Sequence, residues 1–329
     1  MKKNYIWLLL LLLVTAGCQQ AAGEEETKEL TLAHNQPTDH PVHLSLTRFA
    51  ELVEEKSDGE LVIDVYPNGE LGSEREVIEN TQFGTVDIAK VSASALEGFD
   101  PIYSIFSLPY MFESQESFKQ IMANEEITDE IYLNTTDIGF RGLTYYDAGV
   151  RNMYTKDRII ENAEDMAGLK TRVQPSRTSV QMIEAIGGTP TPMSYGEVYT
   201  ALQSGVIDAA ENNETALVNS SHGEVAKNYF FTEHAIVPDM LIMNDEMYSD
   251  LTEEEQQVIE EAAEESTAYH EDLWAEMVEE SVTIAEEEMG VTFYDIDKQT
   301  FIDAVQPLHE QFQENPDTAD IYSRIKEES

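Results

Sequence analysis

Two arginines stand out in a chain that is otherwise strongly acidic. Its 329 residues include 19 Lys and Arg against 65 Asp and Glu, which gives a formal net charge of -46. Arg151 and Arg172 both flank β-like runs near the middle of the chain. A guanidinium can hold one carboxylate through two parallel hydrogen bonds, each worth about 1.5 to 3 kcal/mol. The pair therefore favours an organic acid as ligand, although either arginine taken alone is better explained by an ion pair with one of the many acids.

Other reactive side chains indicate no catalytic chemistry. His34, His40 and His43 are close in sequence, but Pro37 and Pro41 interrupt the helix that would align them on a metal, so capping, turn or single-contact roles are expected. The chain has no Gly-x-Ser-x-Gly, phosphate loop or Gly-x-Gly-x-x-Gly motif. Glu pairs arise by chance at this acid content, so they do not indicate a glycosidase. We expect no cofactor and no enzymatic activity.

The overall composition is that of a folded protein that avoids nucleic acid. Hydrophobic residues make up 41% and aromatic residues 9% of a chain long enough for about two domains. Its negative charge would repel a phosphate backbone over the whole surface. Such an acid excess is best tolerated where salt screens self-repulsion, which suggests a salty extracellular medium.

The N-terminus predicts export and lipid attachment. Lys2 and Lys3 make the start of the chain basic, and residues 6–14 form an unbroken apolar run that is too short to span a bilayer. Cys18 follows an Ala-Gly pair shortly after this run. This arrangement resembles a bacterial lipobox, with Thr15 where that pattern prefers Leu; the alternative is an ordinary signal peptide. Cys18 is the only cysteine, so no intrachain disulfide can form. We expect a signal peptide at 1–17 and a lipidated tether at 18–29.

The next elements alternate between strand and helix periods. Residues 30–33 and 61–66 are predicted as strands, and between them apolar residues recur at helical spacing behind Pro41 until Gly59 ends the helix. This β-α-β order is the unit of a parallel sheet. By contrast, residues 251–289 carry Glu clusters around spaced apolar residues and predict a long, solvated brace. A membrane-active helix would need Lys and Arg on that polar face.

A repeated spacing suggests two equivalent halves. Ser73 with Glu76, and Ser194 with Glu197, both have the spacing of a helix capping box, and a glycine followed by a short apolar strand comes eleven residues after each serine. Capped helices before strands are common, so the repeat supports two lobes only in combination with other signals. Ligands of such sheets lie beyond the carboxyl ends of the strands. This places four polar residues on the rim of a cleft: Ser92, Glu211, Asn212 and Asn213.

Several motifs in one order resemble a known family. Residues 70–76, 146–152, 168–173 and 191–213 are similar to the substrate-binding proteins of tripartite ATP-independent periplasmic (TRAP) transporters of the DctP type. The resemblance covers nearly the whole mature chain. It implies an α/β, two-lobed periplasmic-binding-protein-like fold with a hinge and a long C-terminal helix spanning both lobes. The implied boundaries are 30–148 plus 237–276 for lobe I and 149–236 plus 277–329 for lobe II.

The resemblance also implies roles for individual residues. Arg172 matches the arginine that clamps the substrate carboxylate, and Arg151 is similar to a second arginine near the same group. Asn212 matches a substrate-contacting asparagine, in a motif whose usual proline is Asn213 here. Three further cleft positions are implied, an aromatic ring, an acid at the far end of the ligand and a first-strand residue: Tyr195, Glu74 and His34. Tyr195 is also consistent with a core ring, and Glu74 with a first-turn helix charge.

The expected cargo is a small organic acid, with a hexuronate such as glucuronate or galacturonate as the best match. Glu74, Asn152, Asn212 and Asn213 would supply hydroxyl partners, while residues 214–216 lack the tryptophan and proline usual in that subgroup. A C4-dicarboxylate or another sugar acid is the alternative; a secreted uronide-acting enzyme and a metal-binding lipoprotein are less favoured. The resemblance implies TRAP small and large membrane subunits as partners, and an extracytoplasmic location on the outer face of the cytoplasmic membrane or in the periplasm.

Overall fold

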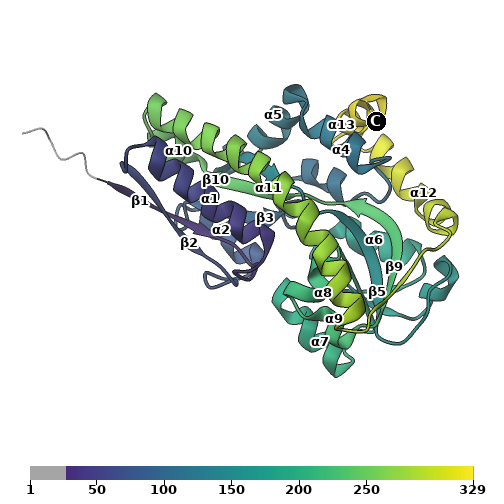
Figure 1. Ribbon diagram of the computed structural model, residues 1–329. Coiled ribbons are helices and arrows are strands. Elements are labelled where there is room, and N and C mark those ends of the chain that lie inside the picture. The colour runs from purple at the N-terminus through teal and green to yellow at the C-terminus, as the bar shows by residue number, and fades with distance from the viewer. Residues whose placement is uncertain (1–26, 329) are drawn as a thin grey trace, which may run out of the picture.

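Two β-sheets with helices around them make up the protein (Figure 1). A computed structural model describes residues 27–328, so the expected signal peptide, Cys18 and most of the tether lie outside the described residues. The first sheet has the order β2-β1-β3-β10-β4. Its strands are β1 Lys28–Ala33, β2 Leu61–Tyr66, β3 Ile88–Ser92, β4 Phe140–Tyr146 and β10 Asp239–Asn244.

The second sheet has the order β11-β9-β5-β8-β6-β7. Its strands are β5 Val150–Thr155, β6 Lys170–Val173, β7 Thr189–Pro192, β8 Ala209–Asn212, β9 Asn228–Ile236 and β11 Thr292–Tyr294. Consecutive strands β4 and β5 lie in different sheets, as do β9 and β10. Both β10 and β5 run antiparallel to their two neighbours, so each sheet is mixed and not purely parallel. The chain therefore crosses between the sheets at 147–149 and again at 237–238.

Helices cover both sheets. Before the second sheet begins, the chain forms α1 Pro41–Lys56, α2 Glu74–Gln82, α3 Ala93–Leu96, η1 Pro101–Ser107, α4 Gln115–Met122, α5 Glu125–Leu133 and η2 Thr136–Ile138. Within the second half follow η3 Ala163–Met166, α6 Arg177–Ala185, η4 Tyr195–Glu197, α7 Val198–Ser204, α8 Thr215–Asn219 and α9 His222–Val225. The C-terminal part contains α10 Asp245–Asp250, α11 Glu253–Glu287, α12 Gln299–Glu314 and α13 Ala319–Glu328.

The first helix forms where the sequence predicts it. His40 caps α1 by accepting the amide hydrogen of Val42, and Pro41 occupies the first turn, where a missing N–H costs nothing. Leu46 and Phe49 lie on its fully buried face, each stabilising the fold by about 1.5 to 3 kcal/mol. The helix ends at Lys56, three residues before the predicted stop, and the strands on either side of it pair in parallel.

The repeated spacing corresponds to repeated structure. In both copies the serine and glutamate form a complete capping box, and the strand that follows is fully buried. The correspondence extends to the turn before each strand. Asp87 accepts the amide hydrogen of Thr31 at 2.8 Å, and Asp208 accepts that of Lys170 at 3.1 Å. Each aspartate thereby joins its strand to the neighbouring strand, and the two capped helices begin on the side where the two sheets face each other.

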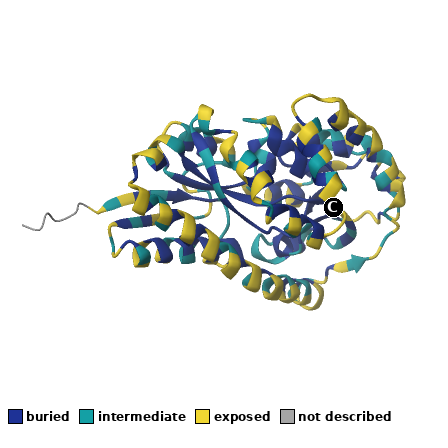
Figure 2. Ribbon diagram, turned by 90° about the horizontal axis from the view of Figure 1, so that it is seen from above, coloured by how far each residue is buried: buried dark blue, intermediate teal, exposed yellow. Residues whose placement is uncertain are grey.

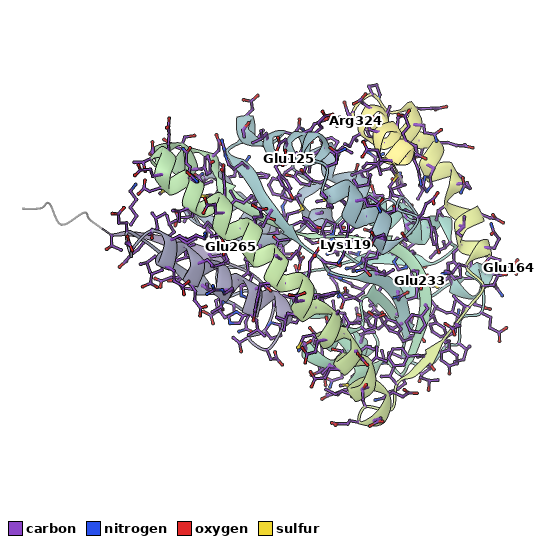
Figure 3. All side chains as sticks on the ribbon, turned by 45° about the horizontal axis from the view of Figure 1, so that its top comes forward. Lys119, Glu125, Glu164, Glu233, Glu265 and Arg324 are labelled. Carbon is purple, nitrogen blue, oxygen red and sulfur yellow. The ribbon has the colours of Figure 1, made fainter. Side chains whose placement is uncertain are left out.

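The long helix α11 braces the molecule and contacts both halves (Figure 1). It packs along α1 and β4 and reaches α8 at its other end. His270 Nδ1 and the Ser45 hydroxyl oxygen form a hydrogen bond of 2.9 Å. The ring of Trp274 lies against Gly149 at the crossover. Its outer face is exposed (Figure 2) and carries many glutamates; one of them, Glu265, which Figure 3 labels, pairs with Lys56 of α1 at 2.8 Å.

The last two helices also touch both halves. The helix α12 lies against α6 and β9, whereas α13 lies against α4 and η1. Within residues 27–328, no helix combines the length and apolar character needed to cross a membrane. The described part of the chain is thus a two-sheet α/β fold tied together by α11, α12 and α13, as predicted for the fold class.

Candidate functional site

A polar cavity lies where the carboxyl ends of strands from the two sheets converge. The cavity itself is narrow, with a volume of about 30 Å³, and adjoins a wider hollow of about 290 Å³. From the first sheet, residues at the ends of β1, β3 and the start of β10 line it: Asn35, Gln36, Lys90, Ser92 and Asp239. From the second sheet come residues at the ends of β6 and β8: Arg172, Gln174, Asn212 and Asn213. This is the location at which α/β sheets place their ligands.

A second hollow adjoins the cavity. It shares Asn35, Glu74 and Tyr195 with the first and is bordered by both capping-box serines, Ser73 and Ser194. The two repeated helices therefore begin at the mouth of the cavity. Their N-termini carry partial positive charge, which favours an anion or a polar acceptor there.

Arg172 is the cavity cation without a carboxylate partner. The residue is 2% exposed, and its Nε and Nη2 donate to the carbonyl oxygen of Met193 at 3.2 and 3.1 Å. A guanidinium has five N–H groups. Three of these have no hydrogen-bond partner among the described residues. Burial lowers the pKa of Arg172, opposed by Glu211 and reinforced by Arg151, although the group stays charged at neutral pH.

Arg151 is bound by its own neighbours. It donates to the side chain of Glu211 through Nε and Nη2, to the Glu211 carbonyl oxygen at 2.8 Å, and to the Asn212 side-chain oxygen at 2.9 Å. These contacts use four of its five N–H groups. Both ends of the pair are buried. The ion pair considered for either arginine is therefore the arrangement found at Arg151, whereas no carboxylate forms a salt bridge with Arg172 among the described residues.

Tyr195 and Glu74 lie at the cavity on opposite halves. The Arg172 guanidinium carbon is 5.8 Å from the centre of the Tyr195 ring, and the Tyr195 hydroxyl hydrogen-bonds Ser220 at 2.6 Å. Glu74 accepts the amide hydrogen of Ser92 at 2.9 Å. Burial raises the pKa of Glu74, against the opposing effect of Lys90.

The two adjacent asparagines line the cavity but are largely occupied. The Asn212 side-chain oxygen accepts from Arg151, and it also accepts the amide hydrogen of Asn213 at 3.0 Å. Asn213 donates to the Ala148 carbonyl oxygen at 2.8 Å and accepts from the Thr215 hydroxyl at 2.6 Å. Asn213 thereby ties β8 to the crossover between the sheets.

Two predicted site residues lie away from this cavity. His34 is 3% exposed, hydrogen-bonds His43 at 3.0 Å, and accepts the amide hydrogen of Gln36, so it positions the cavity loop from behind. Burial, then Lys90 and His43, lower the pKa of His34 to about 2, so the ring is neutral. Asn152 points to the other face of β5, where it accepts the amide hydrogen of Glu233 at 2.8 Å. Neighbouring strand residues face opposite ways, so Arg151 and Asn152 cannot share a face.

Four cavity residues carry no signal in the sequence: Asn35, Gln36, Lys90 and Asp239. Lys90 is 1% exposed and sits in a fully buried strand, where its ammonium pairs with Asp239 at 3.0 Å. A helix residue also contributes, since Trp274 of α11 lines the cavity. Over residues 27–328, no cluster of three or more His, Cys, Asp or Glu side chains could hold a metal ion.

Comparison with known proteins decides the family. Residues 32–315 match the family described as bacterial extracellular solute-binding protein, family 7 (DctP). The chain belongs to this family. It is 40% identical over 286 residues to the protein YiiZ of Salmonella typhimurium, covering 87% of this chain and 88% of that protein. The DctP-family chain is accordingly an extracytoplasmic TRAP solute-binding receptor and not an enzyme.

Solved structures of TRAP solute-binding proteins are closely similar. One from Anaerococcus prevotii with bound D-glucuronate is 40% identical, has a TM-score of 0.89, and aligns over 92% of this chain and 98% of that one. Another from Xanthobacter autotrophicus with bound β-D-galacturonate is 35% identical, has a TM-score of 0.87, and aligns over 90% and 99% of the two chains. These similarities extend to the long helix and to the two-sheet arrangement of the DctP-family chain.

Proposed function

We propose that this receptor captures a hexuronate, with Arg172 as the carboxylate clamp. The observation that carries the proposal is the state of the Arg172 guanidinium, which is buried in the cavity, charged, and without a carboxylate partner. A buried, unneutralised cation is costly, and an anion that pairs with it recovers that cost. The ligand carboxylate would accept from the three free N–H groups of Arg172, near the Tyr195 ring.

Similar solved structures support the choice of a uronate. The similar structures from Anaerococcus prevotii and Xanthobacter autotrophicus hold glucuronate and galacturonate. The polar cavity supports the same class, because a sugar acid needs one anion site and several hydroxyl partners. Asn212, Glu74 and Ser92 line the cavity near that site and are proposed as further contacts.

A C4-dicarboxylate fits less well on charge. It would need a second free cation at the far side of the cavity. Lys90 is the only other cavity cation besides the two arginines, and Asp239 already neutralises it at 3.0 Å. Arg151 is likewise neutralised by Glu211. One unpaired cation favours a ligand with one carboxylate.

Capture would work by closure of two lobes around the ligand. We assign residues 30–148 plus 237–276 to lobe I and 149–236 plus 277–329 to lobe II, with the hinge at the two crossovers. Direct contacts bridge these lobes: His40 with Thr215 at 3.2 Å, and Glu97 with Thr178 at 3.0 Å. A ligand that touches both lobes would favour the closed state by its greater affinity for that state. The loaded receptor would then deliver its cargo to the TRAP small and large membrane subunits.

We further propose that Cys18 is acylated and anchors the receptor to the membrane. Cys18 lies outside the described residues, so the proposal rests on the sequence around it. Replacing it as Cys18→Ser should move the exported protein from the membrane fraction to the soluble extracytoplasmic fraction. Unchanged membrane association would refute acylation.

Calorimetric titration of glucuronate, galacturonate and succinate tests the binding proposal. Arg172→Ala removes two charge-assisted hydrogen bonds and should weaken uronate binding by at least about 100-fold. Arg177→Ala is the matched control, since Arg177 is exposed on the same lobe and lies outside the cavity. Its affinity should stay within about twofold of the unaltered receptor. Undiminished uronate affinity in Arg172→Ala would refute the role of Arg172 as the carboxylate clamp. If the unaltered receptor bound succinate more strongly than either uronate, the proposal of a uronate cargo would be refuted.

A further inference from the structure

The first-sheet side of the cavity carries a neutral but highly polar surface. We call Asn35, Gln36, Lys90 and Asp239 the hydroxyl wall. The Lys90 ammonium donates to the Asn35 side-chain oxygen and to Asp239 Oδ2, each at 3.0 Å. One ammonium hydrogen and the Asp239 Oδ1 oxygen remain without a hydrogen-bond partner among the described residues. The wall thus offers a charged donor and a charged acceptor whose net charge is zero.

Gln36 adds an unsatisfied amide to the same wall. Its Oε1 atom is buried without a hydrogen-bond partner, and no side-chain hydrogen bond of Gln36 is formed within residues 27–328. Buried polar atoms are rarely left unpaired in native proteins, so this one needs a partner from outside the chain. An amide carries both acceptor and donor, so the conclusion does not depend on which way it is flipped. A hydroxyl, which is also both donor and acceptor, is the complementary group.

Gln36 is held in position by the residues behind it. Its backbone amide donates to His34 Nδ1 at 3.2 Å, and the other ring nitrogen of His34 bonds His43 at 3.0 Å. The backbone carbonyl of Gln36 accepts the amide hydrogen of Asn68 at 3.0 Å. The free amide is therefore presented by a fixed loop and not by a flexible surface side chain.

Two of the three asparagines expected to bind hydroxyls are already occupied elsewhere. Asn152 faces away from the cavity, and Asn213 is bonded to Ala148 and Thr215. The free hydrogen-bonding capacity lies instead across the cavity from Arg172, on the other sheet.

We propose that the hydroxyl wall determines cargo specificity by binding the ring hydroxyls of an acid whose carboxylate lies on Arg172. This rests on the proposed function and adds to it the residues that distinguish a polyhydroxylated acid from a plain one. Gln36 is the position with the largest unused capacity. The Lys90–Asp239 pair excludes a second carboxylate, because Asp239 would repel it while Lys90 is already neutralised.

The test compares affinities for matched acids by calorimetry. The probes are D-glucuronate, D-galacturonate and D-gluconate, with cyclohexanecarboxylate as a six-membered ring acid without hydroxyls. Gln36→Leu should weaken binding of the hydroxylated acid with the highest affinity by roughly 10- to 100-fold. The affinity for cyclohexanecarboxylate should be unchanged or higher. Gln181→Leu is the control, because Gln181 is a half-buried glutamine outside the cavity, and it should change neither affinity.

A second variant tests the ion pair without leaving one charge buried. Lys90→Met with Asp239→Leu removes both charges together, which folded proteins commonly tolerate, and melting curves would verify folding. It should reduce binding of hydroxylated acids by at least about tenfold and spare cyclohexanecarboxylate. Equal losses for both kinds of acid, or no loss for the hydroxylated acid in either variant, would overturn the proposal. Failure of the unaltered receptor to bind any hydroxylated acid would also overturn the proposed role of the hydroxyl wall. Preference for gluconate over uronates would refute only the proposal that the cargo is a uronate.

Discussion

The buried pair between Arg151 and Glu211 provides a strong test of how the site is built. Glu211→Gln removes the charge but keeps the shape of the side chain. In the intact protein Glu211 is 2% exposed and accepts two hydrogen bonds from the Arg151 guanidinium, with His234 at 3.4 Å. Glutamine can accept only one of the two guanidinium bonds without placing its own NH₂ against the other. The variant therefore leaves a buried guanidinium without a neutralising carboxylate, although its bonds to the Glu211 carbonyl oxygen and to Asn212 remain.

The size of the effect follows from the pKa of Glu211. Burial by itself would raise this pKa, but Arg151 and then His234 outweigh burial and hold it at about 2, against an ordinary 4.5. A difference of this size corresponds to about 3 kcal/mol of folding free energy at neutral pH. Because the folded pKa is depressed, the contribution is complete above about pH 4.5 and is lost as the pH falls towards 2. Breaking a buried pair from one side costs about 3 to 5 kcal/mol by comparison.

Thermal unfolding at pH 7 and at pH 3.5 measures both the loss of stability and its dependence on pH. At roughly 2 °C per kcal/mol for a chain of this size, Glu211→Gln should lower Tm by about 6 to 10 °C at pH 7, and by less at pH 3.5. The matched control is Glu184→Gln on the exposed face of α6, for which Tm should stay within about 1 °C. Replacing both partners, as Arg151→Met with Glu211→Leu, should recover part of the loss. A Glu211→Gln protein as stable as the control at pH 7 would refute the reasoning.

Three further predictions test the closed arrangement, the core and the surface charge. Glu97→Gln weakens the contacts from lobe I to Ser176 and to the first turn of α6. The dissociation rate of the ligand, measured by stopped-flow release, should therefore rise about threefold or more. An unchanged rate would contradict a bridging role for Glu97. Gly142→Ala places a Cβ 2.6 Å from the Tyr132 ring and should cost about 1 to 3 kcal/mol in urea unfolding, whereas at Gly196, where a Cβ meets nothing within 4 Å, alanine should be tolerated. Raising NaCl from about 0.05 to 0.5 M should raise Tm, because salt screens repulsion within a chain of charge -46; a fall in Tm would contradict this.

The elements of the fold were largely predictable because their signals are local. The apolar spacing of α1, its proline start and the two capping boxes each lie within a few residues, and each forms the structure that the spacing predicts. The mixed character of the sheets was not predictable in this way. It arises from β5 and β10, which follow crossovers between the sheets and run antiparallel to their neighbours. The sequence of a single strand does not indicate the direction of the strands beside it.

The candidate site was predictable only in part, for the same reason. Lys90 and Asp239 are 149 positions apart, and β3 and β10 bring them together through a register that pairs Asp239 with Ser92. A single lysine within an apolar strand carries no pattern of its own. Gln36 is likewise an ordinary loop residue until its amide is found buried and unpaired. The residues found in advance were those within motifs, whereas those found from the structure depend on long-range pairing.

The two cavity arginines differ in how far their charge is compensated, which bears on how an acidic protein would bind an anion as proposed. The chain has a net charge of -46, and most Lys and Arg side chains among residues 27–328 form a salt bridge, including Arg151 in the cavity. Its partner Glu211 lies beside it because β5 and β8 pair with Asn152 opposite Asn212. Arg172 lies on β6, which pairs with β7, and its only hydrogen-bond acceptor among residues 27–328 is the Met193 carbonyl oxygen just beyond β7. A carbonyl fixes the orientation of the guanidinium without cancelling its charge. At physiological ionic strength the repulsion from distant surface acids is screened beyond about 8 Å, so it does not conflict with the proposal that this one uncompensated charge attracts the carboxylate of the ligand.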